Sequence, residues 1–365
     1  MKIFFLYFFI LFILSCSNTK TIKIDLENEI IIPKTYNVFK TSEKIIIDGK
    51  DNEDSWKKSI FSEDFIDIEG VIKPKQKTNM KMMWDEKFLY IFAKLEENHI
   101  WGDITERDKI IYYNNDFEVF INPNNHVFSY GEIEINALGT EWDLFLNKPY
   151  RLKGKADSKW NIKELKSAVF INGTINNPND IDNYWTVEMA IPIKEISQLK
   201  DPFDYHYPKS NDIWRINFSR VNWDYELNKG KYSRKKKNGK YLPEYNWVWS
   251  SQGLINMHVP ENWGFLVFSE KNLGSNISFN HSKKLIVEQT LYALFRKVSF
   301  KEFRYLKDLK NNSQINFENI VYNNREISCN FLKTETGFII NAYDYNNNIK
   351  LSISENGLIK NLTND

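Results

Sequence analysis

The sequence carries almost no net charge and little cysteine. Its 365 residues hold 49 basic and 48 acidic side chains, which leaves a formal charge of +1. Proteins that bind nucleic acid through bulk electrostatics need a basic excess to displace counterions, so this balance argues against a nucleic-acid partner. The sequence also lacks a serine nucleophile elbow, a phosphate-binding loop and a dinucleotide fingerprint, and its five histidines show no paired metal-ligand spacing. These absences disfavour the enzyme classes that depend on those motifs.

The apolar run at the N-terminus is too short to cross a membrane. It extends from Ile3 to Leu14, twelve residues, whereas a spanning helix needs about 20. With Lys2 before it, the run predicts a signal peptide over residues 1–15. The following Ile13-Leu14-Ser15-Cys16 resembles a bacterial lipobox, in which cleavage precedes a cysteine that is then acylated. An ordinary signal peptide that contains a cysteine is the alternative.

Loss of the leader changes both the charge and the thiol count. Lys2 is the only charged residue in 1–15, so the 350 remaining residues carry 48 basic and 48 acidic side chains. Lipidation of Cys16 would leave Cys329 as the sole thiol and allow no intrachain disulfide. The polar stretch that follows predicts a tether over residues 16–35.

Aromatic residues are abundant where charge is not. The chain has 11 Trp, 19 Tyr and 26 Phe, and six of these 56 rings leave with the leader. So many rings in a neutral protein favour a large core, an aromatic binding surface, or both.

Residues 36–268 alternate apolar and polar side chains in short runs broken by Asn, Asp, Gly and Pro. Leu89, Ile91, Ala93 and Leu95 fall on one face of such a run, and Phe117, Val119 and Ile121 on one face of another. This period of two is typical of β-strands, and the spacing predicts an all-β sandwich of about ten strands. On their apolar strand faces, Trp56, Trp185 and Trp214 are expected in the core.

The period changes after a polar linker at 269–276. Apolar residues recur at helical spacing between Ser282 and Leu309, and four strand-like runs follow at 315–321, 325–332, 337–343 and 349–353. Residues 277–365 therefore predict a small α+β module, whose role the pattern does not reveal.

Polar residues share a phase on several predicted strands. They lie opposite the apolar face and would gather on one surface if their strands are neighbours; they are Glu118, Glu132, Glu134, Asn136, Glu188, Arg215, Asn217 and Ser219. A solvated sheet face is the plain alternative. Tyr and Trp residues near the strand ends favour sugar recognition, because the C–H face of a pyranose stacks on a ring while its hydroxyls bond to polar side chains.

The order of several sequence blocks resembles carbohydrate-binding module family 9, and more closely the family-9-like lipoproteins of Bacteroidetes-type bacteria. The blocks are Ile46 to Trp56, Met83 to Ile91, Asn115 to Ile121, Trp185 to Pro192, Trp214 to Arg220, Asn246 to Ser250 and Trp263 to Phe268. The resemblance implies a saccharide-binding β-sandwich over 36–268 with structural calcium nearby. It also implies a poly- or oligosaccharide partner and an association with polysaccharide-degrading enzymes.

Site residues follow from the resemblance position by position. Glu118 matches the acidic residue of the family's strand motif, here Asp116-Phe-Glu118, and Asn136 matches a sugar-contacting Asn. The family's basic residue before that Asn is Glu134 here, which replaces a donor with an acceptor. The stacking rings are expected from Tyr112 or Tyr113 and from Trp247 or Trp249.

Three alternatives remain open at the level of sequence. Glu118 and Glu134 could act as the carboxylate pair of a glycoside hydrolase. Met257-His258 could offer axial ligands to haem, as in some wider relatives of the sandwich. Oxygen-rich turns at 48–54 and 122–125 could hold calcium, although they lack EF-hand spacing.

The sequence thus predicts a lipid-anchored, non-catalytic carbohydrate-binding protein that takes part in polysaccharide capture or breakdown. Its expected location is the cell envelope, at the outer membrane of a Gram-negative bacterium, with the membrane contacted through the lipid on Cys16.

Overall fold

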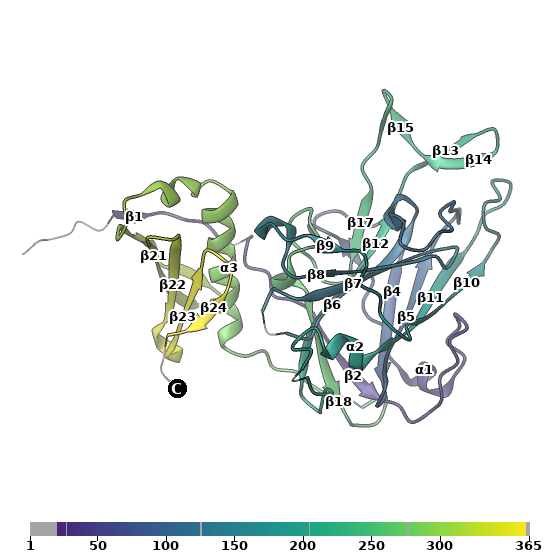
Figure 1. The fold of residues 1–365 in the computed structure, drawn as a ribbon, viewed down its shortest axis with the longest axis horizontal. Helices are drawn as coiled ribbons and strands as arrows, with labels where there is room; N and C mark the ends of the chain where they lie inside the picture. The colour runs from purple at the N-terminus through teal and green to yellow at the C-terminus, as the bar shows by residue number, and fades with distance from the viewer. Residues whose placement is uncertain (1–19, 27, 125, 204, 276, 363–365) are drawn as a thin grey trace, which may run out of the picture.

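A computed structural model describes residues 20–362 except 27, 125, 204 and 276. Most of the chain forms one long antiparallel-rich sheet that curls into a sandwich (Figure 1). Along the sheet the strands run β10 (Lys166–Asn172), β11 (Tyr184–Pro192), β5 (Phe88–Glu96), β4 (Thr78–Trp84), β2 (Thr35–Lys40), β18 (Gly264–Ser269), β12 (Ile213–Asn222), β6 (Asp116–Asn122), β7 (Tyr130–Asn136), β8 (Glu141–Leu146) and β9 (Ala156–Asp157). Two further strands, β17 (Tyr245–Val248) and β3 (Ile66–Asp67), pair beside β12.

The main core lies between the two halves of the curled sheet. Alternate residues of β4, β5 and β11 meet alternate residues of β6, β7 and β12 there, as the period-two pattern predicted. Trp185 and Trp214 belong to this cluster. Trp56, on the short helix α1 (Asp54–Lys58), is buried on the opposite face of the first half-sheet.

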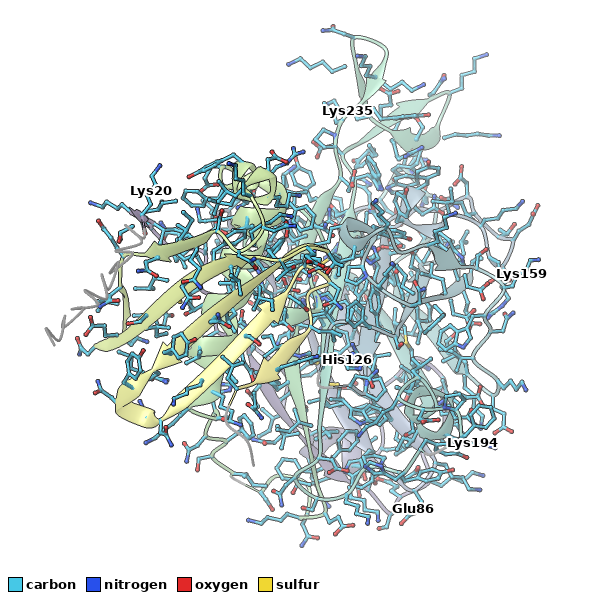
Figure 2. All side chains as sticks on the ribbon, turned by 60° about the vertical axis from the view of Figure 1, so that its left-hand side comes forward. Lys20, Glu86, His126, Lys159, Lys194 and Lys235 are labelled. Atoms are coloured by element: carbon cyan, nitrogen blue, oxygen red, sulfur yellow. The ribbon has the colours of Figure 1, made fainter. Side chains whose placement is uncertain are left out.

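A short helix and two hairpins lie outside the main sheet. The helix α2 (Ile193–Ser197) follows β11, and two hairpins project from the top of the view in Figure 1: β13 (Tyr225–Asn228) with β14 (Lys231–Arg234), and β15 (Lys236–Lys237) with β16 (Lys240–Tyr241). The basic run 234–237 lies on these hairpins, and Lys235 is labelled there in Figure 2. Residues 235–237 of this run are exposed.

The C-terminal module is a second sheet packed on one helix. The helix α3 (Lys284–Phe300) lies between this sheet and the sandwich (Figure 1), and a 3₁₀ turn at Arg304–Asp308 follows it. Figure 2 turns the other face of the sheet forward, where none of the described helices or strands covers it. The strands are β1 (Lys20–Ile22), β19 (Gln314–Phe317), β20 (Ile320–Tyr322), β21 (Arg325–Lys333), β22 (Phe338–Asp344), β23 (Ile349–Ser354) and β24 (Ile359–Asn361).

These elements confirm the fold class, an all-β sandwich followed by a small α+β module. They also alter the picture of residues 16–35, which we expected to be a tether. Lys20–Ile22 pairs in parallel with β19, and Leu26 and Ile30 are buried in the module's core. The described part of this segment is folded because its apolar residues complete that core. None of the helices in the described part of the chain combines the length and apolar character needed to cross a membrane.

Glu261 joins the module to the sandwich. Its buried carboxylate lies between Arg151 of the sandwich, at 2.6 Å, and Arg296 of α3, at 3.0 Å. Its backbone carbonyl accepts hydrogen bonds from Gln289 of α3 and from Arg215 of β12. Burial by itself raises the pKa of Glu261, but the two guanidinium groups outweigh that effect and hold it below the ordinary value. The carboxylate therefore stays ionised at the junction.

Breaking this junction is expected to destabilise the protein. Arg296→Met removes one of the two cations beside Glu261 and should lower the free energy of unfolding by about 3 kcal/mol, because a buried charge loses a partner. Urea denaturation followed by circular dichroism measures the change. Lys57→Met, which removes an exposed pair with Asp54, is the matched control and should cost less than about 0.5 kcal/mol. Equal effects of the two substitutions would contradict the role of Glu261.

Candidate functional site

Strand register brings acidic side chains together on one face of the sheet. Glu118 of β6 lies directly opposite Glu134 of β7, and Glu132 of β7 lies opposite Phe120. On the other side of β6, Ser219 of β12 lies opposite Glu118. Asp116 precedes Glu118 by two positions and so shares its face. We call Asp116, Glu118, Glu132 and Glu134 the acidic floor.

The acidic floor is buried, which makes ionisation costly. Asp116 is fully buried, and none of the four residues is more than 5% exposed. Burial is the largest cause of the raised pKa at each carboxyl, and repulsion from neighbouring carboxylates adds to it. The pKa of Glu118 rises to about 7, and those of the other three lie well above their ordinary values. These carboxyls therefore hold their protons to a higher pH than ordinary carboxyls do, unless a cation replaces the protons.

Little positive charge offsets the acidic floor. Among the described residues, no Lys or Arg forms an ion pair with it, and the nearest basic side chain is His258, whose Nε2 lies 4.0 Å from Glu132. Burial, with a smaller contribution from Arg151, lowers the pKa of His258 to about 3. The imidazole is thus neutral and leaves the carboxyls uncompensated.

A pocket of about 460 Å³ opens above the acidic floor. Four aromatic rings line it, those of Tyr112, Phe120, Trp142 and Tyr150, and the Tyr150 ring meets His258 edge to face at 4.5 Å. Glu244, Asn246 and Asn256 add polar groups. Apolar side chains border the pocket, among them Ile255, which is 74% exposed. A cavity with aromatic walls and a few convergent polar groups suits a small polar ligand that has an apolar face.

The wall that carries His258 is fixed by contacts from several elements. Its Nδ1 lies 2.9 Å from the Tyr130 hydroxyl, and its carbonyl accepts a hydrogen bond from Arg151. The neighbouring Met257 carbonyl accepts one from Trp263 Nε1 at 2.8 Å. Because Arg151 also binds Glu261, the junction with the C-terminal module supports this wall of the pocket.

Of the site residues predicted from the sequence, Tyr112, Glu118 and Glu134 line this pocket. Tyr112 stands beside β7, where its backbone N–H donates to Glu134 at 3.1 Å. Tyr113 lies just outside the lining, 40% exposed, with its ring edge to face with that of Tyr112. The guanidinium of Arg234 covers the Tyr113 ring at 4.1 Å.

The structure does not bring the other predicted residues to this pocket. Asn136 is fully buried, where its side chain accepts from the backbone N–H groups of Leu138 and Thr140 and donates to the Ile104 carbonyl. It therefore holds a turn. Trp247 and Trp249 are 2% exposed and belong to the main core.

The polar residues that share a phase on the predicted strands do not all lie at this pocket. Glu188 lies in the other half of the sheet, where it accepts hydrogen bonds from Trp56 Nε1 and from the backbone of Asp48 and Gly49. It is thus a structural carboxylate. Arg215 serves the Glu261 junction, and Asn217 exchanges hydrogen bonds with the backbone of Ser250.

The site residues predicted from the sequence did not include Trp142, Tyr150 or Glu244, which line the pocket. Trp142 could have been found from its phase, because it alternates with Leu144 and Leu146 and lies opposite Glu134. Tyr150 and Glu244 reach the pocket from loops. Nothing in their local pattern signals that approach.

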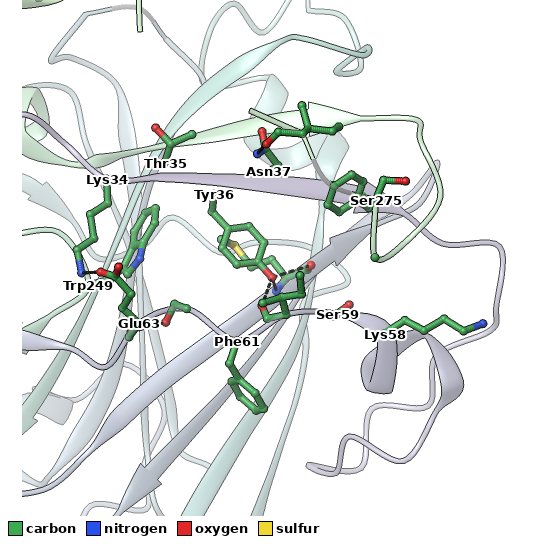
Figure 3. A pocket seen from close by; sticks show the side chains of 16 residues that line it. Lys34, Thr35, Tyr36, Asn37, Lys58, Ser59, Phe61, Glu63, Trp249 and Ser275 are labelled. Carbon is green, nitrogen blue, oxygen red and sulfur yellow. Dashed lines mark hydrogen bonds and ion pairs between the residues drawn. The ribbon is translucent and has the colours of Figure 1, made fainter. Parts of the chain in front are cut away.

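A second cavity, of about 420 Å³, lies between β2, residues 58–63 and the linker near 275 (Figure 3). Its main polar groups bond to one another. The Tyr36 hydroxyl donates to the Ile60 carbonyl at 2.7 Å, and Lys34 pairs with Glu63 at 2.9 Å. Trp249, which lines this cavity, is otherwise a core residue. The pocket above the acidic floor is therefore the stronger candidate.

In the described part of the chain, three or more acidic, His or Cys side chains are close enough to hold a metal ion at one place. One carboxylate oxygen each from Asp116, Glu118 and Glu134 lies within 4.8 Å of the other two. The turns singled out for calcium are built differently. Asp51 pairs with buried Lys81 at 2.8 Å, and Asn122 donates to the carbonyls of His126 and Phe128.

The loop that would supply haem ligands also lies at this pocket. Met257 and His258 both line it, but the His258 Nδ1 is engaged with Tyr130 and Met257 packs among Phe120, Leu144 and Trp263. Met257 is 7% exposed. The two side chains thus contribute to the wall in the arrangement that the structure describes.

Residues 47–206 match the family described as carbohydrate family 9 binding domain-like. For this segment, the resemblance to carbohydrate-binding module family 9 that the sequence blocks indicated is thereby confirmed. A search among curated proteins finds no match to the chain.

Solved structures with related folds include a family 9 module from Caldicellulosiruptor kristjanssonii in complex with cellotriose. It is 13% identical, with 67% of this chain and 100% of that one covered at a TM-score of 0.43. The same module in complex with glucose is 14% identical, with the same coverage and a TM-score of 0.42. A candidate carbohydrate-binding protein from Bacteroides uniformis is 15% identical over 65% of this chain and 99% of that one, at a TM-score of 0.46.

The raised pKa of Glu118 predicts how stability depends on pH. Between pH 4.5 and about 7 the folded protein holds a proton on Glu118 that the unfolded chain releases, so rising pH favours unfolding. This group alone should lower the free energy of unfolding by about 3 kcal/mol across that range. Urea denaturation at a series of pH values, in buffer free of divalent cations, measures the slope.

Substitution separates this effect from other titrations. Glu118→Gln should flatten the slope, whereas Glu69→Gln, at an exposed carboxyl, should leave it unchanged. A slope that Glu118→Gln does not alter would show that Glu118 is ionised in the folded protein.

Proposed function

We propose that this chain is a non-catalytic carbohydrate-binding protein that holds a poly- or oligosaccharide in the pocket above the acidic floor. The observation that carries the proposal is the combination of aromatic rings with carboxyl and amide groups in one cavity of a family 9-like domain. Pyranose rings have apolar C–H faces and polar edges, so they need both kinds of group at once. Tyr112, Trp142 and Tyr150 offer the stacking surfaces.

The chemistry of the floor supports binding of hydroxyl groups. Carboxyls with a raised pKa keep their protons to a higher pH, and a protonated carboxyl both donates and accepts hydrogen bonds. The amides of Asn246 and Asn256 do the same at the sides of the pocket. A neutral saccharide, rich in hydroxyls that also donate and accept, matches this lining.

The same carboxyls argue against the hydrolase alternative. A glycosidase keeps one carboxyl protonated and the other ionised, because different environments push their pKa values apart. Glu118 and Glu134 both have raised pKa values, and burial is the main cause at each. No Lys or Arg of the described residues pairs with either carboxyl to hold it in the ionised form, as the nucleophile or base of a glycosidase would require.

A lipid on Cys16 would place this domain at the cell envelope. Residues 1–19 lie outside the described part of the structure, so this step of the proposal depends on the lipobox-like Ile13 to Cys16. An outer-membrane lipoprotein of a Gram-negative bacterium, working beside polysaccharide-degrading enzymes, would use the pocket to capture their substrate.

Removing one ring tests the pocket. Tyr150→Ala should weaken saccharide binding about tenfold, because a stacked ring contributes about 1.4 kcal/mol. The half-exposed Tyr150 can be truncated with little effect on the core. A glycan array identifies a ligand, and isothermal titration calorimetry with the purified protein measures its affinity.

Tyr345→Ala is the matched control, since Tyr345 is also exposed and stacks on one ring, that of Tyr343 in the C-terminal module. It should leave affinity unchanged. No saccharide binding at millimolar concentration would contradict the proposal. Release of sugars, lost in Glu118→Gln, would indicate the hydrolase, and a haem absorption band in the purified protein would indicate the haem alternative.

Lipidation has a separate test. Cys16→Ser should move the chain from the membrane fraction to the soluble fraction of the producing cells, because no other anchor is expected once the leader is cut. Fractionation and immunoblotting measure the distribution. Cys329→Ser is the control and should stay with the membranes. A Cys16→Ser protein that also stays there would rule out the lipid anchor.

A further inference from the structure

We propose that Asp116, Glu118 and Glu134 bind a divalent cation of the calcium type at the base of the pocket. Two of the three ligands come from β6 and one from β7, so hydrogen-bonded strands hold all three in place. This cation site was not among the turns considered from the sequence. It coincides with the pocket that we assign to the saccharide.

The spacing of the carboxylates suits calcium. Calcium binds oxygen at about 2.3 to 2.6 Å, so two ligand oxygens on one ion lie at most about 5.2 Å apart. One oxygen from each of the three residues falls within 4.8 Å of the other two. The three oxygens are therefore close enough for one ion to bind them with at most a small adjustment of the side chains.

Orphaned polar atoms at the same spot are the second, independent observation. Both carboxylate oxygens of fully buried Asp116 lack a hydrogen-bond partner. The hydroxyl of fully buried Ser219, opposite Glu118, lowers the pKa of that carboxyl but has no partner at hydrogen-bond geometry. The backbone of Val221 approaches Asp116 closely enough to lower its pKa, yet forms no hydrogen bond of normal geometry. Buried polar groups are almost always paired, so neighbouring orphans indicate a bound partner.

The identity of the donors selects the kind of ion. Carboxylate and hydroxyl oxygens are hard ligands that favour calcium, magnesium or manganese over zinc or copper. The cationic side chains nearby are engaged elsewhere: Arg151 binds Glu261, and Arg234 covers the rings of Tyr113 and Trp223. An external cation is thus the group that can compensate these charges.

The cation would also face the ligand. Calcium takes six to eight oxygen ligands, and Glu118 and Glu134 line the open pocket while Asp116 lies behind them. Positions on the pocket side would remain for hydroxyl groups. This part of the inference rests on the proposed saccharide function: the ion would bind sugar hydroxyls directly and supply the positive charge that the lining lacks.

Titration of calcium chloride into the metal-free purified protein tests the site. Calorimetry should show binding of one ion per chain, and Asp116→Asn and Glu134→Gln should each weaken it at least tenfold. Glu270→Gln is the matched control, because Glu270 is exposed and lies outside both the pocket lining and the triad, and should change the affinity less than twofold. Circular dichroism checks that each variant is folded.

Further titrations identify the ion. Magnesium chloride should bind more weakly than calcium, and methylammonium chloride should not compete with it. Absence of calcium binding at millimolar concentration would overturn the proposal, and so would binding that survives in folded Asp116→Asn.

The link to saccharide is tested by repeating the glycan titration with calcium and with a chelator. A loss of at least tenfold in saccharide affinity without calcium supports the bridging role. Equal affinity in both conditions would overturn that role and leave the proposed saccharide function intact. Calcium binding in a protein that binds no saccharide would support the cation site and contradict the saccharide function, so the two failures are distinguishable.

Discussion

The pairing of β6 with its two neighbours is the constraint from which the site follows. Asp116–Asn122 lies between β12 and β7 in a register that places Glu118 between Ser219 and Glu134. Because side chains alternate along a strand, a slip of one residue would send the acidic side chains into the core and Phe117 and Val119 out of it. The apolar face thus pins the register, and the register in turn concentrates carboxyls that repel one another. The stability of the core offsets the free-energy cost of this repulsion. The pocket is consequently lined by carboxyls whose pKa values are raised.

The C-terminal module has a structural part in the same pocket. Glu261 binds α3 through Arg296 and the sandwich through Arg151, and Arg151 also bonds to the carbonyl of His258 on the pocket wall. The loop of 255–263 therefore depends on the junction for its position. A module to which the sequence assigned no role thus supports the wall of the pocket, and its own N-terminal strand is supplied by residues that we expected to be a tether.

The alternation of side chains along the predicted strands identified most of the acidic floor but few residues of the pocket walls. Glu118, Glu132, Glu134 and Ser219 were correctly grouped because period-two alternation survives in the fold. Glu188 shares that phase and lies elsewhere, since phase does not reveal which strands are neighbours. The same phase argument would have assigned Trp247 and Trp249 to the core, because Val248 between them lies opposite Ser219 on the pocket face. Tyr150 and His258 come from loops, whose approach depends on tertiary contacts such as those of Arg151.

Formal neutrality of the chain conceals an uneven distribution of charge. Nearly equal numbers of basic and acidic side chains argue against nucleic acid as a partner. Yet no Lys or Arg of the described structure pairs with the acidic floor, and its nearest basic side chain, His258, is neutral. Proton uptake and cation binding are two ways to neutralise the same carboxyls, so they compete. With protons, the floor offers hydrogen-bond donors to a saccharide; with calcium, it would offer open coordination positions instead. Either state suits hydroxyl groups, and the choice between them depends on pH and on the calcium concentration around the protein.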